Sequence, residues 1–458
     1  MNEILMALNY CIVFYFAAMG LTHTILLLAS FPDIMARFKE AEYGNVSQLI
    51  NQERLIPITT IVPAFNEEKR ILNSVLSIMR SQYKNVKIIV VNDGSSDNTV
   101  KLLVEHFQMY AVPVIVRKNL SQSKIFARYE SSAYPNLMVI DKEHTNTGDT
   151  LNVGIDACST PIFASVDADT LLEPEAITRI MFTFLSQPHC IAVGGAVYVL
   201  NGAKIKDGEV IESRIPDGLV AALQVPEYLR SFMFGRAGWN TFGGSLSYAG
   251  AFTVFETQAV VQAGGYDLNN FAQDAEIIVK LRSMMTDKKY PHSIHFTPSA
   301  FAWTEVPSTV KRYWIQRNHW QRGLMRSLFA FKQMFFNPKY KVVGLFTYPF
   351  FIFFEVFGGF IEGLAYITFA LGWYCHVSGI AEVTPLCIAL AWGYLAILTL
   401  ASASLNLITF NKYHRPIDIL QLLSLTIIEL VGFRQMHVLC RCVATVEYGV
   451  NRLRGKKL

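Results

Sequence analysis

Two aspartates, Asp167 and Asp169, follow a short apolar run and stand two positions apart. The run Ile162–Val166 is typical of a strand that is buried on both faces. Open α/β sheets place ligands at the carboxyl ends of their strands, and Mg²⁺ typically takes one or two carboxylates together with substrate phosphates. The pair therefore predicts a metal site, although a simple turn after a strand would also account for it.

Two further segments place polar residues where strands end and helices begin. Pro63, Ala64 and Glu67 belong to VPAFNEE, a strand–loop–helix joint, and Asp93 ends a strand in VNDGSSDNT, at a sheet edge where a base or ribose could bind. In QDAE, Asp274 stands at a helix start just after a glycine-rich turn. A carboxylate there either favours the helix dipole or acts as a general base toward an acceptor hydroxyl.

Aromatic residues and arginines are crowded in the segment 314–323, WIQRNHWQRG. One interpretation is an interfacial helix with tryptophan anchors and snorkelling arginines. The other is a site that stacks a sugar on tryptophan and holds phosphate with arginine. The sequence leaves both interpretations open at this point.

The composition indicates a membrane component beside a soluble one. Of 458 residues, 52% are hydrophobic and only 17% are charged, whereas about 25% are charged in soluble domains. The net charge of +4 does not favour a nucleic-acid partner, and basic clusters next to apolar segments fit anionic lipid better. The seven cysteines show no metal or disulfide spacing, which predicts a reducing cytosolic compartment for the soluble part.

Several apolar stretches are long enough to cross a bilayer. Ile4–Phe31, followed by Arg37 and Lys39, predicts a retained transmembrane helix with a cytosolic carboxyl end. Later candidates are Val342–Tyr374, Leu386–Phe410 and, more weakly, Ile417–Phe433. A full third crossing would put the basic tail outside, so we expect a tilted, re-entrant or interfacial last segment and a cytosolic carboxyl end.

Three glutamates, Glu355, Glu362 and Glu429, stand inside these later apolar stretches. Carboxylates are costly in lipid and often mark functional paths. They would either line a path for a polymer or lie near helix ends and between packed helices.

Between the first and later apolar stretches, apolar runs alternate with amphipathic segments, the pattern of strand–helix units in a largely parallel sheet. The predicted strands are Ile58–Val62, Lys87–Val91, Val112–Val116, Leu137–Ile140, Ile162–Val166 and Ile191–Val199. The predicted helices are Glu67–Ser81, Asn98–Phe107, Pro174–Ser186 and Asp274–Met285. The expected fold class is therefore α/β with a mostly parallel sheet, joined to transmembrane and interfacial α-helices.

The order of the motifs is more specific than any one of them. VPAFNEE, VNDGSSDNT, DAD, GAFTVF with AGGYD, QDAE, and AWTEVP with QRNHW follow one another between Pro57 and Gly323. This series resembles the membrane-embedded family 2 glycosyltransferases, which include cellulose, hyaluronan, chitin and poly-N-acetylglucosamine synthases. The segment Gly432–Gln435 is similar to a late motif of bacterial members.

The resemblance implies a GT-A-like nucleotide-sugar-binding domain that inverts the sugar of a UDP-sugar donor, with Mg²⁺ or Mn²⁺ as cofactor. Asp274 would deprotonate the acceptor, and Asp169 would hold the metal that bridges the diphosphate. The nucleotide and donor would contact Pro63, Ala64, Glu67, Asp93, Asp149 and Asp167. The acceptor and diphosphate end would comprise Gln316, Arg317, His319, Trp320 and Arg322.

Three positions depart from the family pattern. His319 stands where an arginine usually precedes the tryptophan, Gln273 replaces the usual glutamate before the catalytic aspartate, and Thr147 replaces a lysine. Arg317 or Arg322 would take over from the missing arginine, or affinity would become sensitive to pH. These changes bear on the donor and on polymerisation more than on the fold.

We expect a synthase that extends a β-linked extracellular polysaccharide and passes it through its own helices. It would lie in the inner (plasma) membrane with its catalytic domain in the cytosol, and its partners would be the UDP-sugar, the growing polysaccharide or a glycolipid acceptor, the lipid bilayer and export subunits. One alternative is transfer of a single sugar to a polyprenyl phosphate or glycolipid. Another is a catalytically silent sugar-nucleotide-binding subunit of an export complex.

The expected organisation has six parts. They are an N-terminal transmembrane helix (1–35), a cytosolic linker (36–56), a GT-A glycosyltransferase domain (57–306), interfacial helices with the QRNHW motif (307–340), a C-terminal transmembrane region (341–440) and a basic tail (441–458).

Overall fold

A computed structural model describes residues 2–42, 55–116, 119–270, 272–376, 380–413 and 415–455. The chain divides into two compact units that alternate along the sequence. The sheet unit comprises Ala36–Arg214 and Ser245–Glu305, and the helical unit comprises Met1–Met35, Ile215–Gly244 and Val306–Leu458. Most of the expected linker, residues 43–54, and the last three residues of the expected tail lie outside the described residues.

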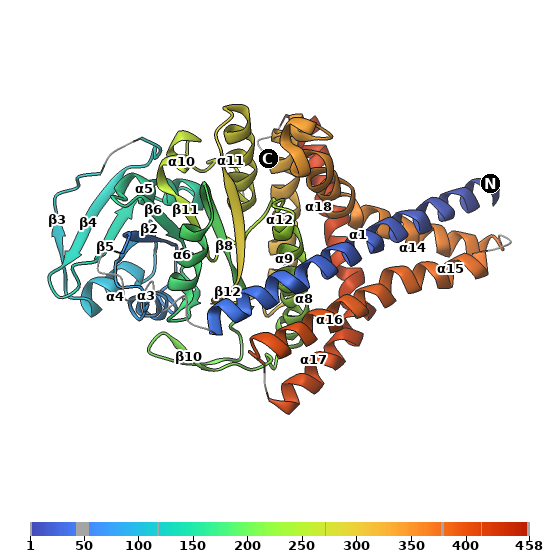
Figure 1. The fold of residues 1–458 in the computed structure, drawn as a ribbon, viewed down its shortest axis with the longest axis horizontal. Coiled ribbons are helices and arrows are strands. Elements are labelled where there is room, and N and C mark those ends of the chain that lie inside the picture. The colour runs from blue at the N-terminus through green and yellow to red at the C-terminus, as the bar shows by residue number, and fades with distance from the viewer. Residues whose placement is uncertain are drawn as a thin grey trace. The chain divides into compact units, whose positions relative to one another are not determined.

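The sheet unit is built on a ten-stranded sheet in the order β3-β4-β5-β2-β1-β6-β11-β8-β12-β7 (Figure 1). The strands are β1 Ile58–Ala64, β2 Val86–Asp93, β3 Met109–Val112, β4 Ile125–Ser131, β5 Leu137–Lys142, β6 Ile162–Ser165, β7 Thr170–Leu172, β8 Cys190–Val199, β11 Thr253–Glu256 and β12 Ser293–Thr304. The core β5-β2-β1-β6 is parallel, as is the pair β8-β12, and the other neighbours are antiparallel. The predicted parallel arrangement is thus confirmed for the core of a mixed sheet. A separate hairpin joins β9 Lys204–Lys206 to β10 Glu209–Glu212.

One predicted strand is wrong and several were not predicted. The strand predicted over Val112–Val116 ends at Val112, because Pro113 has no amide hydrogen to donate to the sheet. Strand β4 was missed because most of its residues are only half-buried, so they lack the apolar run on which the prediction depended. Strands β11 and β12 are largely buried but were not distinguished from the surrounding apolar sequence.

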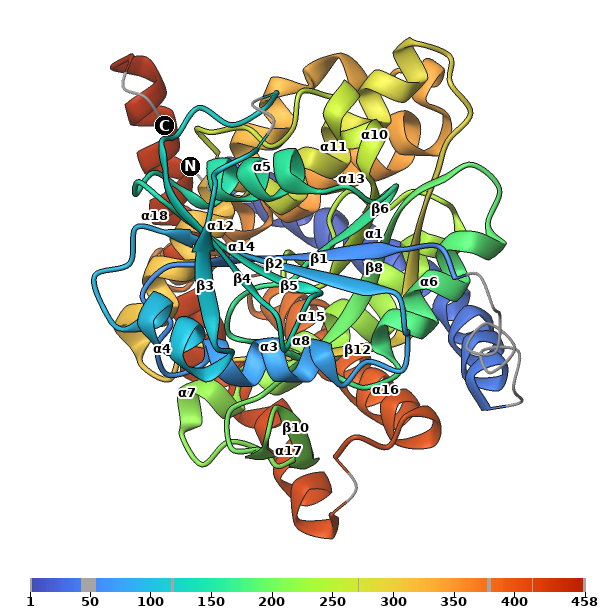
Figure 2. The ribbon, with the colours of Figure 1, turned by 90° about the vertical axis from the view of Figure 1, so that its left-hand side faces the viewer.

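Helices cover both faces of the sheet in this unit. They are α3 Ile71–Met79, α4 Thr99–His106, α5 Thr147–Ala157, α6 Ala176–Ser186, α10 Thr257–Gln262 and α11 Gln273–Asp287. Figure 2 shows α5 and α10 on one face and α3 and α4 on the other. The helix predicted from Glu67 begins only at Ile71, after Asn66 takes a left-handed conformation with φ 56°.

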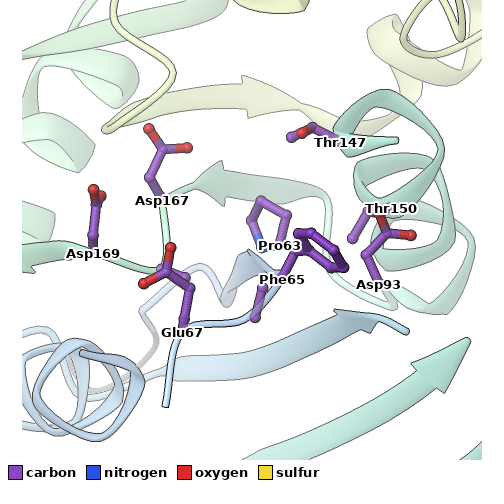
Figure 3. A pocket seen from close by; sticks show the side chains of 10 residues that line it. Pro63, Phe65, Glu67, Asp93, Thr147, Thr150, Asp167 and Asp169 are labelled. Carbon is purple, nitrogen blue, oxygen red and sulfur yellow. The ribbon is translucent and has the colours of Figure 1, made fainter. Parts of the chain in front are cut away.

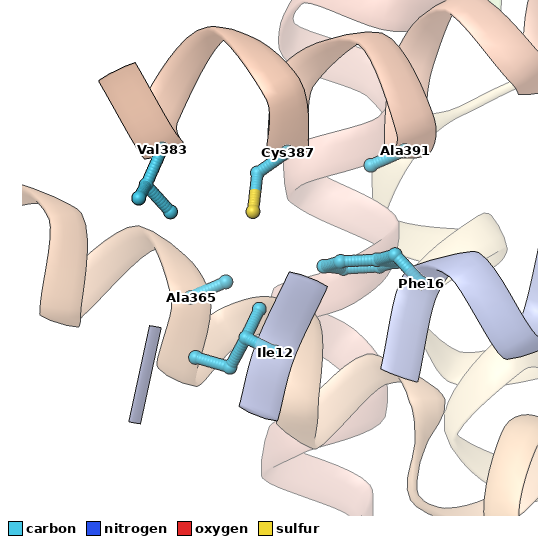
Figure 4. Close-up of a cluster of buried hydrophobic side chains, with 6 residues drawn as sticks. All are labelled: Ile12, Phe16, Ala365, Val383, Cys387 and Ala391. Atoms are coloured by element: carbon cyan, nitrogen blue, oxygen red, sulfur yellow. The ribbon is translucent and has the colours of Figure 1, made fainter. Parts of the chain in front are cut away.

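The helical unit is formed by three separated parts of the chain. Its helices are α1 Asn2–Glu42 as far as Met35, α7 Leu219–Ala222, α8 Gln224–Arg230, α9 Ala237–Thr241, α12 Val310–Ala330, α13 Tyr348–Phe350, α14 Gly358–Tyr374, α15 Ile380–Ile388, α16 Tyr394–Thr409, α17 Pro416–Ile428 and α18 Arg434–Leu453. Figure 4 shows Ile12 and Phe16 of α1 beside Ala365 of α14 and Cys387 of α15. The first helix therefore packs against helices formed more than 350 residues later.

Three helical stretches in the described part of the chain are long and apolar enough to cross a membrane: Glu3–Lys39, Val383–Thr409 and Pro416–Leu453. A fourth would be the pair Val343–Val356 and Gly358–Tyr374, which is bent by 44°. The last stretch is broken where Gly432 takes φ 85°. On the far side of this break, α18 packs along α12.

Candidate active site

A pocket of about 230 Å³ lies in the sheet unit, where the neighbouring strands β2, β1 and β6 end. Parallel strands bring their carboxyl ends to one edge, which is why residues distant in sequence meet there. The pocket is lined by Pro63, Ala64, Phe65, Glu67, Asp93, Thr147, Thr150, Asp167, Ala168 and Asp169. Figure 3 shows Glu67, Asp167 and Asp169 gathered at one end and Asp93 with Thr150 at the other, with Pro63 and Phe65 between them. Six of the predicted site residues are therefore brought together.

The acidic end of the pocket crowds like charges. Burial, together with the neighbouring carboxylates of Asp169 and Asp274, raises the pKa of Asp167 to about 8. Burial also raises the pKa of Asp169, against the hydrogen bond from Thr304 and the positive charge of Arg70. The pKa of Glu67 is raised by burial and by Asp169. A cation at this end would relieve the repulsion.

Asp274 faces this acidic end from the first turn of α11. Its Oδ2 accepts a hydrogen bond from the Gly250 amide at 3.3 Å, and its Oδ1 accepts one from the Ala275 amide at 2.9 Å. A methyl group on Gly250 would lie 3.5 Å from Asp274 Cβ and 3.9 Å from both carboxylate oxygens of Asp167. The two acids therefore flank the same glycine, which leaves the space between them open.

At the opposite end, Asp93 is 4% exposed and held by several donors. Its Oδ1 accepts from the Thr145 amide at 2.9 Å and is paired with Lys142 Nζ. Its Oδ2 lies 3.1 Å from His144 Nδ1, and the His144 ring stacks on Phe65 with 4.3 Å between ring centroids. Gly94 takes φ 65° here, and a side chain on it would meet the His144 backbone at 2.8 Å. Several groups therefore hold the Asp93 carboxylate in place at this end of the pocket.

Asp149 is buried behind this group. It lies in the first turn of α5, where its backbone amide donates to the capping side chain of Asn146. Its Oδ1 accepts from the Gln122 amide at 3.0 Å, and its Oδ2 lies 3.7 Å from Lys142 Nζ. Lys142 and Thr145 both connect it to Asp93, since the Thr145 hydroxyl donates to Asp149 Oδ2 at 3.2 Å. Sequence reasoning did not assign Lys142, His144, Phe65 or Thr150 to the site. The signal for Lys142 was a basic residue at the end of a strand that neighbours the strand ending in Asp93.

The predicted acceptor residues all lie on α12, in the helical unit. Arg317 is 3% exposed, and its Nη2 is 2.9 Å from Glu227 Oε2 of α8. The guanidinium also stacks 4.2 Å from the Trp320 ring and 4.9 Å from the Tyr313 ring. Trp320 itself is 44% exposed. Partial burial and then Arg322 lower the pKa of His319. Gln316 is half-buried and its Oε1 lacks a hydrogen-bond partner within the described chain.

The fold occurs in a known class of enzyme. A mannosyltransferase from Pyrobaculum calidifontis, PcManGT, solved in complex with GDP-Man and Mn²⁺, matches with a TM-score of 0.53 at 15% identity, covering 83% of this chain and 99% of that one. The fold is GT-A-like, as the sequence predicted. The family model described as "Glycosyltransferase like family 2" matches residues 56–323, and the chain belongs to this family. The predicted enzyme class, a family 2 glycosyltransferase, is thereby confirmed.

Two curated relatives are each 25% identical to this chain. The poly-beta-1,6-N-acetyl-D-glucosamine synthase of Staphylococcus aureus (strain COL) is 25% identical over 298 residues, which are 64% of this chain and 61% of the relative. The probable glycosyltransferase YdaM of Bacillus subtilis (strain 168) is 25% identical over 333 residues, 72% of this chain and 70% of that one. The chain thus spans about three fifths of the length of the synthase that it matches.

Proposed function

We propose that this protein is an inverting membrane glycosyltransferase that extends a β-linked polysaccharide from a UDP-sugar. The observation that carries the proposal is the position of Asp274, which faces Asp167 across Gly250 at the acidic end of the pocket. The proposed base would therefore lie at the end of the pocket that would hold the diphosphate. The poly-beta-1,6-N-acetyl-D-glucosamine synthase of S. aureus supports polymer synthesis as the outcome.

The two ends of the pocket suit the two ends of a nucleotide sugar. We assign the uracil to the Asp93 end, with Pro63 and Ala64 along the wall, and the diphosphate to the end with Glu67 and Asp167. Asp149 would act indirectly, by holding Lys142 beside Asp93. The close packing around Asp93 would favour one base over others because its partners cannot readily move.

The acidic end has the chemistry for Mg²⁺ or Mn²⁺. Its carboxylate oxygens are the ligands that hard divalent cations prefer, and their crowding raises the pKa of Asp167 and Asp169. Asp169 would hold the cation, with Asp167 beside it. The Mn²⁺ in the Pyrobaculum mannosyltransferase structure is consistent with this use. When bound, the cation would neutralise charge that develops on the leaving diphosphate.

Inversion requires one displacement at the anomeric carbon. The acceptor hydroxyl oxygen forms the new bond, the bond to the diphosphate breaks, and the hydroxyl proton passes to Asp274. Two backbone amides orient the Asp274 carboxylate, and the missing side chain at Gly250 leaves room for the acceptor. Because the proton is taken as the bond forms, the Asp274 carboxylate must lie within hydrogen-bonding distance of the acceptor hydroxyl. This position matters more than a strongly shifted pKa.

The helical unit would provide the acceptor platform and the membrane anchor. Trp320 is exposed enough to stack on a sugar ring, with Gln316, His319 and Arg322 on the same helix, whereas Arg317 is engaged by Glu227 and would support the Trp320 ring from behind. Three candidate membrane helices and the break at Gly432 suit a multi-pass protein of the inner membrane. We propose that the catalytic domain is cytosolic and that export subunits assist.

The test uses purified full-length protein in nanodiscs with Mn²⁺ and a panel of radiolabelled nucleotide sugars that includes UDP-N-acetylglucosamine. We expect one UDP-sugar to give a size ladder or high polymer. Asp274→Asn should lower the rate by a factor of about 10²–10⁴ while UDP binding is kept. Asp287→Asn, at the exposed far end of the same helix, is the matched control and should retain the rate.

Each other result excludes part of the proposal. One organic-soluble labelled product would mean transfer of a single sugar to a lipid. UDP binding without transfer from any donor would mean a silent subunit. Full activity of Asp274→Asn would remove that residue as the base.

A further inference from the structure

The motif AWTEVP ends strand β12 beside the acidic pair of the pocket. Strand β12 runs antiparallel to β7, with Thr304 opposite Thr170 and Trp303 opposite Leu171. Thr170 directly follows Asp169 in sequence. The sheet register therefore brings the last residues of β12 to the metal ligand proposed above, although more than 130 positions separate them.

Two contacts connect the end of β12 to the acidic segment. Thr304 Oγ1 donates a hydrogen bond to Asp169 Oδ1 at 3.1 Å, and Thr304 is 8% exposed. The Trp303 indole Nε1 donates to Glu173 Oε1 at 3.0 Å, which anchors the same strand end to the residues after β7. The Thr170 hydroxyl lies farther from the same Asp169 oxygen, at 3.5 Å. Thr304 is thus the better-placed donor of two threonines that face each other across the ladder.

The next residue of the motif acts on the charge of the pocket. Glu305 Oε2 lies 2.6 Å from Arg70 Nη2, and Arg70 Nη1 lies 3.2 Å from Glu67 Oε2. Arg70 is therefore shared between a glutamate that lines the pocket and one that follows β12. Its positive charge acts on Asp169 as well. Without Glu305, the guanidinium would be free to pair more fully with the pocket acids.

We propose that Thr304 and Glu305 are positioning residues for the cation site, an inference that rests on the proposed function. Thr304 occupies one oxygen of Asp169 and orients the carboxylate so that its other oxygen remains for the cation. Glu305 holds Arg70, so that this guanidinium does not compete with the cation for the acids. Hydrogen-bonding partners of metal ligands of this kind typically change metal affinity or activity by 10–100-fold when removed.

The experiment measures Mn²⁺ binding directly, apart from catalysis. Full-length protein in nanodiscs is saturated with UDP and titrated with Mn²⁺, and free Mn²⁺ is read from its EPR signal. Thr304→Val should weaken Mn²⁺ binding about tenfold, and Thr304→Ser, which keeps the hydroxyl, should bind within about twofold of the wild type. Thr170→Val is the matched control and should also stay within about twofold, because its contact with Asp169 is long. Glu305→Gln should weaken binding about threefold, since Arg70 is held less firmly.

The outcomes separate the inference from the proposed function. Equal losses in Thr170→Val and Thr304→Val, or wild-type affinity in Thr304→Val with unchanged thermal unfolding, would overturn the positioning role. If the wild type transfers sugar but does not bind Mn²⁺, the positioning role would also be overturned, whereas the transferase proposal would stand. The predicted binding pattern in a protein that transfers no sugar would support the positioning role and refute the proposed function.

Discussion

The helical unit and the acidic end of the pocket in the sheet unit hold their acids in different ways. In the helical unit, Glu227, Glu362 and Glu429 each pair with an arginine, respectively Arg317, Arg434 and Arg230. At the acidic end of the pocket, Asp167 is repelled by Asp169 and Glu67, and the pKa values of all three acids are raised by burial and by neighbouring carboxylates. A paired acid is satisfied by the fold, whereas crowded acids lower stability and are typical of a site that receives a ligand.

The difference bears on the three glutamates inside the apolar stretches. Glu362 and Glu429 accept two hydrogen bonds each from one arginine and are buried. Glu355 is more exposed and lies 3.9 Å from Arg441. The sequence left two interpretations open for these glutamates. For Glu362 and Glu429, the arginine pairs favour packing between helices over a path for a polymer.

The largest effect should come from breaking a pair in the helical unit. Arg434→Met leaves Glu362 buried without its cation, and removing one partner of a buried pair costs about 3–5 kcal/mol. The double variant Arg434→Met/Glu362→Met should recover most of that loss, because no charge is left unpaired. Thermal unfolding in nanodiscs measures both. A single variant as stable as the wild type would show that this pair is not structural.

A smaller effect, on activity alone, is expected from Gly250→Ala in the sheet unit. The added methyl group would make ordinary van der Waals contacts with Asp274 and Asp167, so the fold should tolerate it. It would fill the space between the two acids, and we expect the transfer rate to fall about tenfold with UDP binding unchanged. Gly218→Ala is the control, since a methyl group there has nothing within 4 Å. An unchanged rate would mean that the acceptor does not pass between these acids.

The smallest effect concerns the stability that is lost because Asp167 lies close to other acids. Because the pKa of Asp167 is raised to about 8, the folded protein holds a proton that the unfolded chain releases near pH 4. The contribution of the protonated Asp167 to the free energy of unfolding is therefore full below pH 4, and it is lost as the pH rises toward 8 and above. In EDTA, Asp167→Asn should flatten this decline and be about 1 kcal/mol more stable than the wild type at pH 9.

Thermal unfolding from pH 4 to pH 9 tests this prediction. Added Mn²⁺ should stabilise the wild type more than Asp167→Asn, because ligand binding to the folded state alone raises stability. Parallel curves for the two proteins would show that Asp167 is not under repulsion and would remove the contrast between the acidic end of the pocket and the helical unit.

Much of the pocket was predictable because the ends of buried strands can be recognised in the amino-acid sequence. Asp93 and Asp167 each follow an apolar run, and parallel strands bring such ends together. The pairing of Asp93 with Lys142 was not predictable, since it depends on the register in which β2 and β5 place these residues opposite each other. The position of Thr304 beside Asp169 likewise depends on the register of β12 with β7.

The division of the chain into two units could not be predicted from the sequence, for a different reason. The segment Ile215–Gly244 lies within the range expected for the catalytic domain, yet it belongs to the helical unit. Its apolar residues Phe234 and Trp239 pack with Leu26, Phe350 and Leu398. No composition change marks this segment, because its short helices contain arginines as well as aromatic residues.

This interleaving constrains how the protein can be made and dissected. Strands β11 and β12 are translated after residue 244, and β11 lies between β6 and β8 in the finished sheet. During synthesis, the central strand β11 is therefore made only after residues 215–244, which belong to the helical unit. The sheet cannot be completed before that segment has been synthesised. No single uninterrupted stretch of the gene encodes the sheet unit alone. To make the sheet unit from residue 36 to residue 305 without helical-unit segments, residues 215–244 would have to be removed and the cut ends rejoined.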